Sequence, residues 1–523
     1  MDPTCGEAVF LLAAARRLRS LGADPAVTAT QLTGIDVHVP SLDASRNALR
    51  KESFDVTLVK SDFFDLLTPS QIGDKVGWHD AVVGNPPFVR YQEHTGGARK
   101  RSASAALAQG VRLNGLASSW AATLVHASAF LKPEGRLAMV VPAELLTVGY
   151  AEPVRRWLRQ RFGAVNLFMF ERLQFRDADE HVVLLVARGR GPCDSFGLYH
   201  VEDANDLAEL HPADNWGANP AAEGKWSDLV LPLETRQLFK SVVLESMDRL
   251  DVYGIPELGT VTGANDYFAL SESTRRKYGL AERHLKRISP PGTRHLKGMA
   301  FTRAQWEELR LQGDQRVWLL HPEPRAKSKG LVAYIGHGET QGIPGAYKCS
   351  VRDPWWRPPA VPVPDLFFTY MSHRYPRIIA NLSGATFLNS MHGLRLRSTA
   401  PSVARDALPL MALNSATMLG AEIMGRSYGG GILKMEPREA ASLPVPTTDA
   451  LAAAWRKLGP GWANLDAALQ RGEWWVVVAE VDKVLLKDIL KLADDQVTAI
   501  RDAAAILRVR RTRQTESHDA AKT

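Results

Sequence analysis

Cysteine is scarce in this 523-residue chain, and long apolar runs are missing from it. The three cysteines, Cys5, Cys193 and Cys349, are an odd number at wide spacing, so they form neither a disulfide framework nor a metal-binding pair. No run reaches the roughly 18 to 20 apolar residues of a membrane span. The N-terminus lacks the basic and apolar segments of a secretion signal. We therefore expect a soluble, cytoplasmic protein without a membrane partner.

The composition is that of a globular protein with a modest excess of positive charge. Charged residues make up 23% of the chain and hydrophobic residues 45%, which excludes a mainly disordered protein, and the length is enough for two or three cores. The 64 basic and 57 acidic residues give a formal net charge of +7. This excess favours an anionic partner but does not identify one.

The first 190 residues alternate short apolar runs with longer helical patterns, which predicts an α/β domain of βαβ units with a mainly parallel sheet. Strands are expected at 33–37, 56–61, 80–84, 136–142, 165–170 and 181–187, and helices at 7–21, 118–131 and 151–162.

The pattern changes after this first domain. Residues 191–235 are rich in Gly, Pro, Asn and Asp, which predicts a linker or an irregular edge. Residues 236–446 contain short strands, many turns and scattered Trp, Tyr and Arg, which predicts a second domain of mixed or β-rich type. Residues 447–523 predict a C-terminal helical segment.

Three short segments of the first domain have residues that suit a nucleotide-like ligand. The turn Asp2-Pro3-Thr4-Cys5-Gly6 leads directly into an apolar helix, so its amides can approach an adenosyl cofactor closely. Asp36 ends the next strand, where a carboxylate can accept ribose hydroxyls, and Asp62 ends another with Phe63 beside it. Each segment also has a structural interpretation: a common turn, a helix cap, or a core aromatic. The three spaced glycines of dinucleotide enzymes are absent, which argues against a nicotinamide or flavin enzyme.

The most specific signal is Asn85-Pro86-Pro87-Phe88 at the end of an apolar strand. Two prolines remove two amide donors and fix φ, which leaves rigidly placed carbonyl acceptors. Asn85 Oδ1 and the Pro86 carbonyl can each accept one hydrogen of a planar amino group, while Phe88 stacks on the ring that carries it. A Pro-Pro turn alone is unremarkable. After the three preceding signals in this order, it predicts an amino-group site beside an adenosyl cofactor.

These segments together resemble the gamma-class amino-methyltransferases of DNA, such as the TaqI-like and XhoI-like enzymes of type II restriction-modification systems. The resemblance covers the first 190 residues, including 130–142, Phe175 and the expected strand 181–187, and extends more loosely to 262–268 and 425–435. It implies a Rossmann-like S-adenosylmethionine-dependent methyltransferase domain, followed by a mixed or β-rich target-recognition domain and the C-terminal helical segment.

The resemblance also implies a reaction and a set of site residues. The expected reaction is methyl transfer to the amino group of an adenine flipped out of double-stranded DNA, without a metal. Phe175 would pack against the flipped adenine, and a separately encoded restriction endonuclease or defence-system component would be a partner. The residues expected to bind S-adenosylmethionine are Asp2, Pro3, Thr4, Cys5, Gly6, Asp36, Asp62 and Phe63, and those of the catalytic motif are Asn85, Pro86, Pro87 and Phe88. Positions that could contact DNA or simply carry surface charge are Arg294, Lys297, Arg377, Asn389, His392, Arg395 and Arg426.

The chain departs from the family pattern near its start. Glu7-Ala8 stands where many relatives have a small polar residue and Gly. The family usually has a strand and a further cofactor-binding segment before the turn, and we expect these to be missing through a misplaced start or a true truncation. Two other functions stay open: a non-catalytic DNA-binding or specificity protein with a decayed methyltransferase fold, and a methyltransferase of a protein glutamine or an RNA base.

Overall fold

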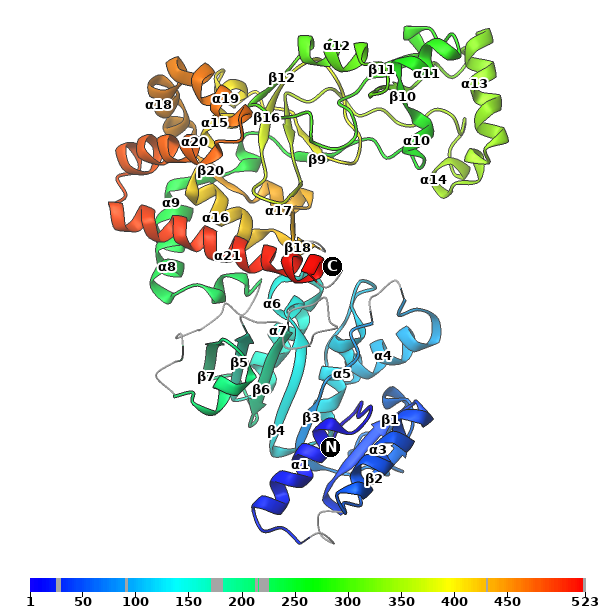
Figure 1. Ribbon diagram of the computed structural model, residues 1–523, viewed down its shortest axis with the longest axis vertical. Coiled ribbons are helices and arrows are strands. Elements are labelled where there is room, and N and C mark those ends of the chain that lie inside the picture. The colour runs from blue at the N-terminus through cyan, green and yellow to red at the C-terminus, as the bar shows by residue number, and fades with distance from the viewer. Residues whose placement is uncertain are drawn as a thin grey trace. The chain divides into compact units, whose positions relative to one another are not determined.

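The computed structural model describes residues 1–24, 30–89, 93–170, 182–211, 215, 225–428 and 431–520. The chain divides into two compact units, Met1–Leu233 and Glu234–Thr523 (Figure 1). Each unit has a hydrophobic core of its own.

A five-stranded sheet forms the centre of the first unit, and a separate parallel pair lies near the N-terminus of the chain. The sheet has the order β3 (His79–Gly84), β4 (Leu131–Pro142), β6 (Val182–Arg188), β5 (Ala164–Phe170) and β7 (Ser195–Val201). The separate pair consists of β1 (Thr33–Asp36) and β2 (Thr57–Lys60). Strand β7 belongs to the segment expected to be a linker or an irregular edge.

The direction of β6 corrects the expectation of a mainly parallel sheet. Strands β3 and β4 are parallel, as are β5 and β7, but β6 runs antiparallel to both β4 and β5. Only residues 171–181 connect β5 to β6. A parallel crossover needs about a dozen or more residues, usually with a helix, so a connection of this length favours the antiparallel arrangement.

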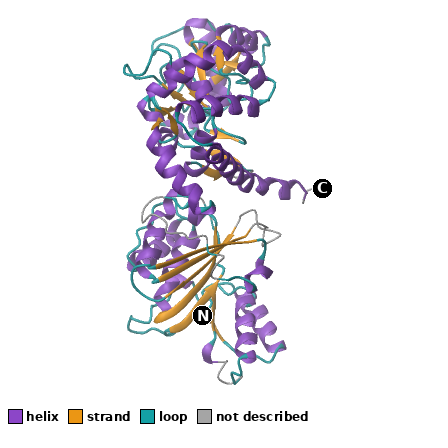
Figure 2. Cartoon of the chain, turned by 90° about the vertical axis from the view of Figure 1, so that its left-hand side faces the viewer, coloured by secondary structure: helices purple, strands orange, loops and turns teal. Residues whose placement is uncertain are grey.

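Helices lie on both sides of these strands (Figure 2). They cover a central strand whose alternate side chains Leu137, Met139 and Val141 are fully buried. Helices α3 and α4 add to the helices predicted from periodicity, and α4 has mostly small Ala, Ser and Gly side chains that give little amphipathic contrast. The helices of this unit are α1 (Val9–Ser20), α3 (Val39–Lys51), α4 (Gly96–Ala108), α5 (Ser119–Ala127), α6 (Glu144–Thr147) and α7 (Glu152–Arg161).

Met1 and Asp2 lie between β1 and β3 and hydrogen-bond to both strands. The Met1 amino group donates to the Ala81 carbonyl of β3, and the Met1 carbonyl accepts from the Val83 amide, both at 2.9 Å. Asp2 makes an equivalent pair of backbone bonds with β1, at 2.8 and 3.0 Å. These two residues therefore join the β1–β2 pair to the five-stranded sheet.

In its described residues, the second unit combines four small sheets with many helices, so it is mixed in type. Its large core includes the fully buried rings of Phe268, Trp306 and Phe367. The first two sheets have the orders β12 (Ala300–Thr302), β16 (Ile378–Leu382), β14 (Leu366–Phe368), β17 (His392–Leu394), β9 (Pro256–Leu258), and β10 (Ala269–Ser271), β13 (Arg316–Leu320), β11 (Leu285–Arg287). The other two have the orders β15 (Met371–Ser372), β19 (Ile432–Lys434), β18 (Arg426–Tyr428), and β20 (Pro444–Pro446), β8 (Met247–Arg249).

The C-terminal part of the second unit is helical, as the sequence pattern predicts. The longest helix is α21 (Asp494–Ala520), and its Arg511 forms a buried ion pair with Glu422 of α16 (Ser415–Met424) at 2.7 Å. No single helix in the described ranges is long and apolar enough to cross a membrane, whereas α15 (Ala404–Met411) and α16 meet that test together with a bend of 80° between them. The remaining helices are α8 (Leu233–Leu238), α9 (Leu244–Ser246), α10 (Asn265–Phe268), α11 (Glu272–Lys277), α12 (Arg303–Leu311), α13 (Lys329–Thr340), α14 (Tyr347–Ser350), α17 (Pro437–Ala441), α18 (Thr448–Leu458), α19 (Trp462–Gln470) and α20 (Trp474–Val481).

Candidate functional site

The turn from Asp2 to Gly6 is fixed by the elements around it. The Gly6 amide donates to the Asp36 carboxylate at 2.9 Å, and the Gly6 carbonyl accepts from the Ser45 hydroxyl of α3 at 2.6 Å. Gly6 has a φ of 50°, a left-handed conformation that glycine adopts readily. A Cβ on Gly6 would meet nothing within 4 Å, so the space beside this part of the turn is open.

Two strand glycines allow this turn to pack closely. A Cβ on Gly34 would lie 2.5 Å from the Leu11 side chain, and a Cβ on Gly84 would lie 2.9 Å from Asp2 Oδ1. Ala8, one of the positions that depart from the family pattern, has a φ of 66° and is fully buried. A left-handed conformation costs a residue with a Cβ about 1 to 2 kcal/mol. Ala8, at a position where many relatives have Gly, therefore adds local backbone strain directly after the turn.

Asp36 connects this turn to the start of α3. Its Oδ2 accepts from the Gly6 amide, and its Oδ1 accepts from the His38 amide at 2.8 Å. Each carboxylate oxygen has a further lone pair for a ligand hydroxyl. Burial raises the pKa of the neighbouring Asp2 carboxyl to about 7, because the charged form loses its hydration.

Asp62 and Phe63 are less open than the turn. Asp62 accepts from the Phe64 amide at 3.0 Å and forms an ion pair with Arg101 of α4 at 2.8 Å. The Phe63 ring is 5% exposed and packs against His126, with ring centroids 4.7 Å apart. Phe63 therefore belongs to the core of the unit, which is the structural interpretation left open for it above.

The Asn85-to-Phe88 segment leaves the end of β3 beside the turn. The Asn85 carbonyl accepts from Thr4 Oγ1 at 3.4 Å, so the two predicted motifs are neighbours. Asn85 is exposed, and no described residue hydrogen-bonds its side-chain amide. Phe88 is half-buried and packs against a small cluster that includes Phe170. Phe175 lies outside the described residues.

Ser119, at the first position of α5, contacts this segment and was not singled out by the sequence patterns. Its Oγ accepts from the Val89 amide at 3.0 Å and donates to the Pro87 carbonyl. The Ser119 amide donates to the Val89 carbonyl at 3.0 Å. A Ser at the start of an apolar helix was the only signal available, and it does not indicate contact with a segment 30 residues away.

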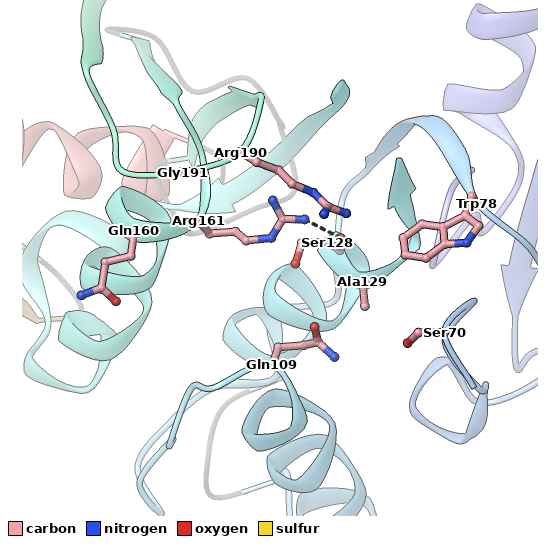
Figure 3. A pocket seen from close by; sticks show the side chains of 9 residues that line it. All are labelled: Ser70, Trp78, Gln109, Ser128, Ala129, Gln160, Arg161, Arg190 and Gly191. Atoms are coloured by element: carbon pink, nitrogen blue, oxygen red, sulfur yellow. Dashed lines mark hydrogen bonds between the residues drawn. The ribbon is translucent and has the colours of Figure 1, made fainter. Parts of the chain in front are cut away.

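A hollow of about 360 Å³ lies at the other end of the strands from the Asn85 segment, where β3, β4 and β5 begin (Figure 3). Trp78, Arg161 and Arg190 line it, and none of its lining residues belongs to the turn or to the Asn85 segment. In the described part of the chain, no three His, Cys, Asp or Glu side chains are placed to share a metal ion.

Two family models match this chain. The C-terminal domain of the Type II methyltransferase M.Eco57I matches residues 223–486, which is about half of the chain. The Eco57I restriction-modification methylase matches residues 34–174. The chain belongs to the Eco57I family of Type II methyltransferases. Members of this family are restriction-modification methyltransferases of DNA, which confirms the predicted enzyme class. The assignments to the gamma class and to adenine stay predictions.

Individual relatives are distant but span most of the chain. The Type II methyltransferase M.AccI of Acinetobacter calcoaceticus is 22% identical over 72% of this chain and 70% of its own length. M.XamI of Xanthomonas campestris pv. amaranthicola is 22% identical over 86% of this chain and 81% of its own length.

Solved structures are similar in fold. The Type IIL restriction-modification enzyme MmeI, solved in complex with DNA, aligns with a TM-score of 0.57 and 13% identity over 97% of this chain and 72% of its own. The modification subunit of a putative type I restriction enzyme from Vibrio vulnificus YJ016 has a TM-score of 0.33 and 20% identity over 38% of this chain, which spans 42% of that subunit. The MmeI likeness confirms the predicted fold class of this Eco57I-family member.

Proposed function

We propose that this Eco57I-family chain transfers a methyl group from S-adenosylmethionine to the exocyclic amino group of an adenine flipped out of double-stranded DNA. The observation that carries the proposal is the position of Asn85. Its side-chain amide is exposed and unbonded among the described residues, and its backbone touches Thr4 of the turn. This position supports the assignment of Asn85 as an amino-group acceptor beside the turn that we assign to the cofactor.

The chain's contribution to the reaction is positioning and electrostatics. The amino nitrogen of adenine is a poor nucleophile because its lone pair is delocalised into the ring. Asn85 Oδ1 and the Pro86 carbonyl would accept its two hydrogens and favour a more tetrahedral nitrogen. Phe88 would stack on the base, which must leave the duplex to enter such a site. S-adenosylmethionine supplies the electrophilic methyl group.

The residues around the turn fit this cofactor. The open space beside Gly6 gives room for a ligand against the turn, and Asp36 retains lone pairs for ribose hydroxyls. Asp62 would share its carboxylate between Arg101 and an adenosyl amino group. The rest of the surface that contacts the cofactor would be formed by Asp2, Pro3, Thr4 and Cys5.

Replacement of Asp36 tests the cofactor side of the proposal. We expect Asp36→Ala to weaken S-adenosylmethionine binding by about 1.5 to 3 kcal/mol, the usual scale for hydrogen bonds to a charged group. The measurement is calorimetric titration of the purified chain. Asp43→Ala is a matched control, because Asp43 lies on α3 and pairs only with exposed Arg46 among the described residues. If Asp36→Ala and Asp43→Ala bound S-adenosylmethionine with equal affinity, Asp36 would only hold the backbone of the turn and would not contact the cofactor.

The second unit supplies the basic residues that we assign to DNA, but the structure reduces the set of candidates. The half-buried Arg377 donates to three backbone carbonyls, and the buried His392 bonds the Met435 carbonyl. Arg395 and Arg426 form ion pairs with Glu257 and Glu439. Arg377 and His392 therefore have structural roles, whereas Arg395 and Arg426 would have to give up these ion pairs to contact DNA. Asn389 accepts a hydrogen bond from Asn265.

Arg294 and Lys297 remain as candidates for phosphate contact. Both are exposed in one short segment, and neither pairs with a described acidic residue. We expect the double variant Arg294→Ala, Lys297→Ala to weaken binding to specific and non-specific duplexes alike. The slope of log K against log salt should become shallower by about 1 to 2. A control that neutralises Lys457, which pairs with Asp488, should leave the slope unchanged. An unchanged slope in the double variant would remove this segment from the DNA interface.

A further inference from the structure

We infer that Ser119 is a positioning residue that holds the Asn85-to-Phe88 segment in its working geometry. This inference rests on the proposed function, because it assigns Ser119 to the reaction through Phe88 and its neighbours. Ser119 is 4% exposed and lies at the first position of α5, on a different element from the segment that it contacts.

The chemistry of the segment explains why an external anchor is needed. Pro86 and Pro87 have no amide hydrogen, so this stretch cannot be fixed through donors at those two positions. The polar backbone groups on either side of Phe88 include the Pro87 carbonyl and the amide and carbonyl of Val89. Ser119 bonds these three: its Oγ donates to Pro87, its Oγ accepts from Val89, and its amide donates to the Val89 carbonyl.

These three bonds fix the backbone on both sides of Phe88. The peptide groups before and after that residue determine where its ring lies. On its other side, the one side-chain hydrogen bond between the segment and the rest of the described chain is the longer one from Thr4 Oγ1 to the Asn85 carbonyl, at 3.4 Å. The first α5 amide also gains an acceptor that the helix itself cannot offer. Ser119 is therefore the stronger of the two anchors of the segment.

Replacement of Ser119 should separate positioning from binding. We expect Ser119→Ala to lower kcat for methyl transfer by about 10- to 100-fold, since a small misplacement of reacting groups costs that much. The affinity for S-adenosylmethionine should not change, because no bond of Ser119 reaches the turn. Ser119→Thr keeps the hydroxyl and should recover most of the lost kcat.

A second measurement and a control variant keep the test decisive. Hydrogen exchange of the peptide that contains Val89 should be faster in Ser119→Ala than in the unmodified chain, whatever the activity. Ser128→Ala is the matched control, because Ser128 is 1% exposed and its hydroxyl bonds only the Val125 carbonyl of its own helix among the described residues. The control should change neither exchange at Val89 nor kcat.

The outcomes distinguish the inference from the proposed function. Unchanged exchange at Val89, or faster exchange with unchanged kcat, would overturn the role of Ser119 while the adenine reaction stood. An unmodified chain that transfers no methyl group to adenine would overturn the proposed function. In that case the exchange comparison would still show whether Ser119 anchors the segment.

Discussion

Asn85→Ala should abolish measurable methyl transfer while the chain still binds S-adenosylmethionine. The Asn85 side chain is exposed and makes no hydrogen bond with a described residue, so its removal should not disturb the packing of β3. Loss of one acceptor in a preorganised site typically lowers kcat by about 10² to 10³. The measurement is single-turnover transfer of labelled methyl groups to duplex DNA, beside calorimetric titration with the cofactor.

Asn114→Ala is a suitable control for this variant. Asn114 is also exposed in the first unit, and its side chain only accepts from the Leu116 amide at 2.9 Å among the described residues. It should retain full activity. If Asn85→Ala kept more than about a tenth of the activity, the loss would be too small for a preorganised acceptor, and polarisation of the amino group by Asn85 would be wrong.

Glu272→Ala should produce the largest loss of stability, in the second unit. Glu272 is 2% exposed and accepts a bidentate pair of bonds from Arg275 at 2.7 and 2.9 Å. Trp318 also donates to it at 2.8 Å, Arg276 at 3.0 Å and Arg310 at 3.4 Å. Removing one partner of a buried ion pair costs about 3 to 5 kcal/mol. We expect about 3 kcal/mol, since the arginines keep some contact with water.

Thermal and acid unfolding check this expectation. For a unit of this size, about 3 kcal/mol corresponds to a Tm lower by about 6 to 12 °C. The arginines, led by Arg275, lower the pKa of Glu272 to about 2. Its contribution is therefore complete above its unfolded pKa of about 4.5 and is lost as the pH falls toward 2. The stability of Glu272→Ala should change less over that window. Glu308→Ala, on the exposed side of α12, should behave like the unmodified chain.

The sequence predicts those features that depend on neighbouring residues. The strand that ends at Gly84 and the Asn-Pro-Pro-Phe segment after it are local patterns, and both lie where the pattern indicates. The turn beside Asp36 is likewise recognisable because a small-residue turn before an apolar helix has a characteristic composition. Helix α4 was not predicted, because its Ala and Ser side chains give little amphipathic contrast. The antiparallel direction of β6 was not predicted either, because it follows from the short connection after Phe170.

Long-range contacts could not be predicted in this way. Arg377 and His392 have the side chains of DNA-binding residues, but in the fold both hydrogen-bond to backbone carbonyls of the same chain. Ser119 acquires its contacts only when α5 begins beside a segment that is distant in the sequence. Residue type indicates what a side chain can bind, whereas its partner is decided by tertiary packing.

The most direct test of the proposed function is the identity of the methylated base. The purified chain would be incubated with S-adenosylmethionine that carries an isotopically labelled methyl group and with duplex DNA of mixed sequence. The products would then be digested to nucleosides and separated by mass spectrometry. We predict label in N6-methyladenine, and none when Asn85 is replaced by Ala. Label in a methylated cytosine, in added RNA or in protein, or no label at all despite cofactor binding, would contradict the assignment to DNA adenine.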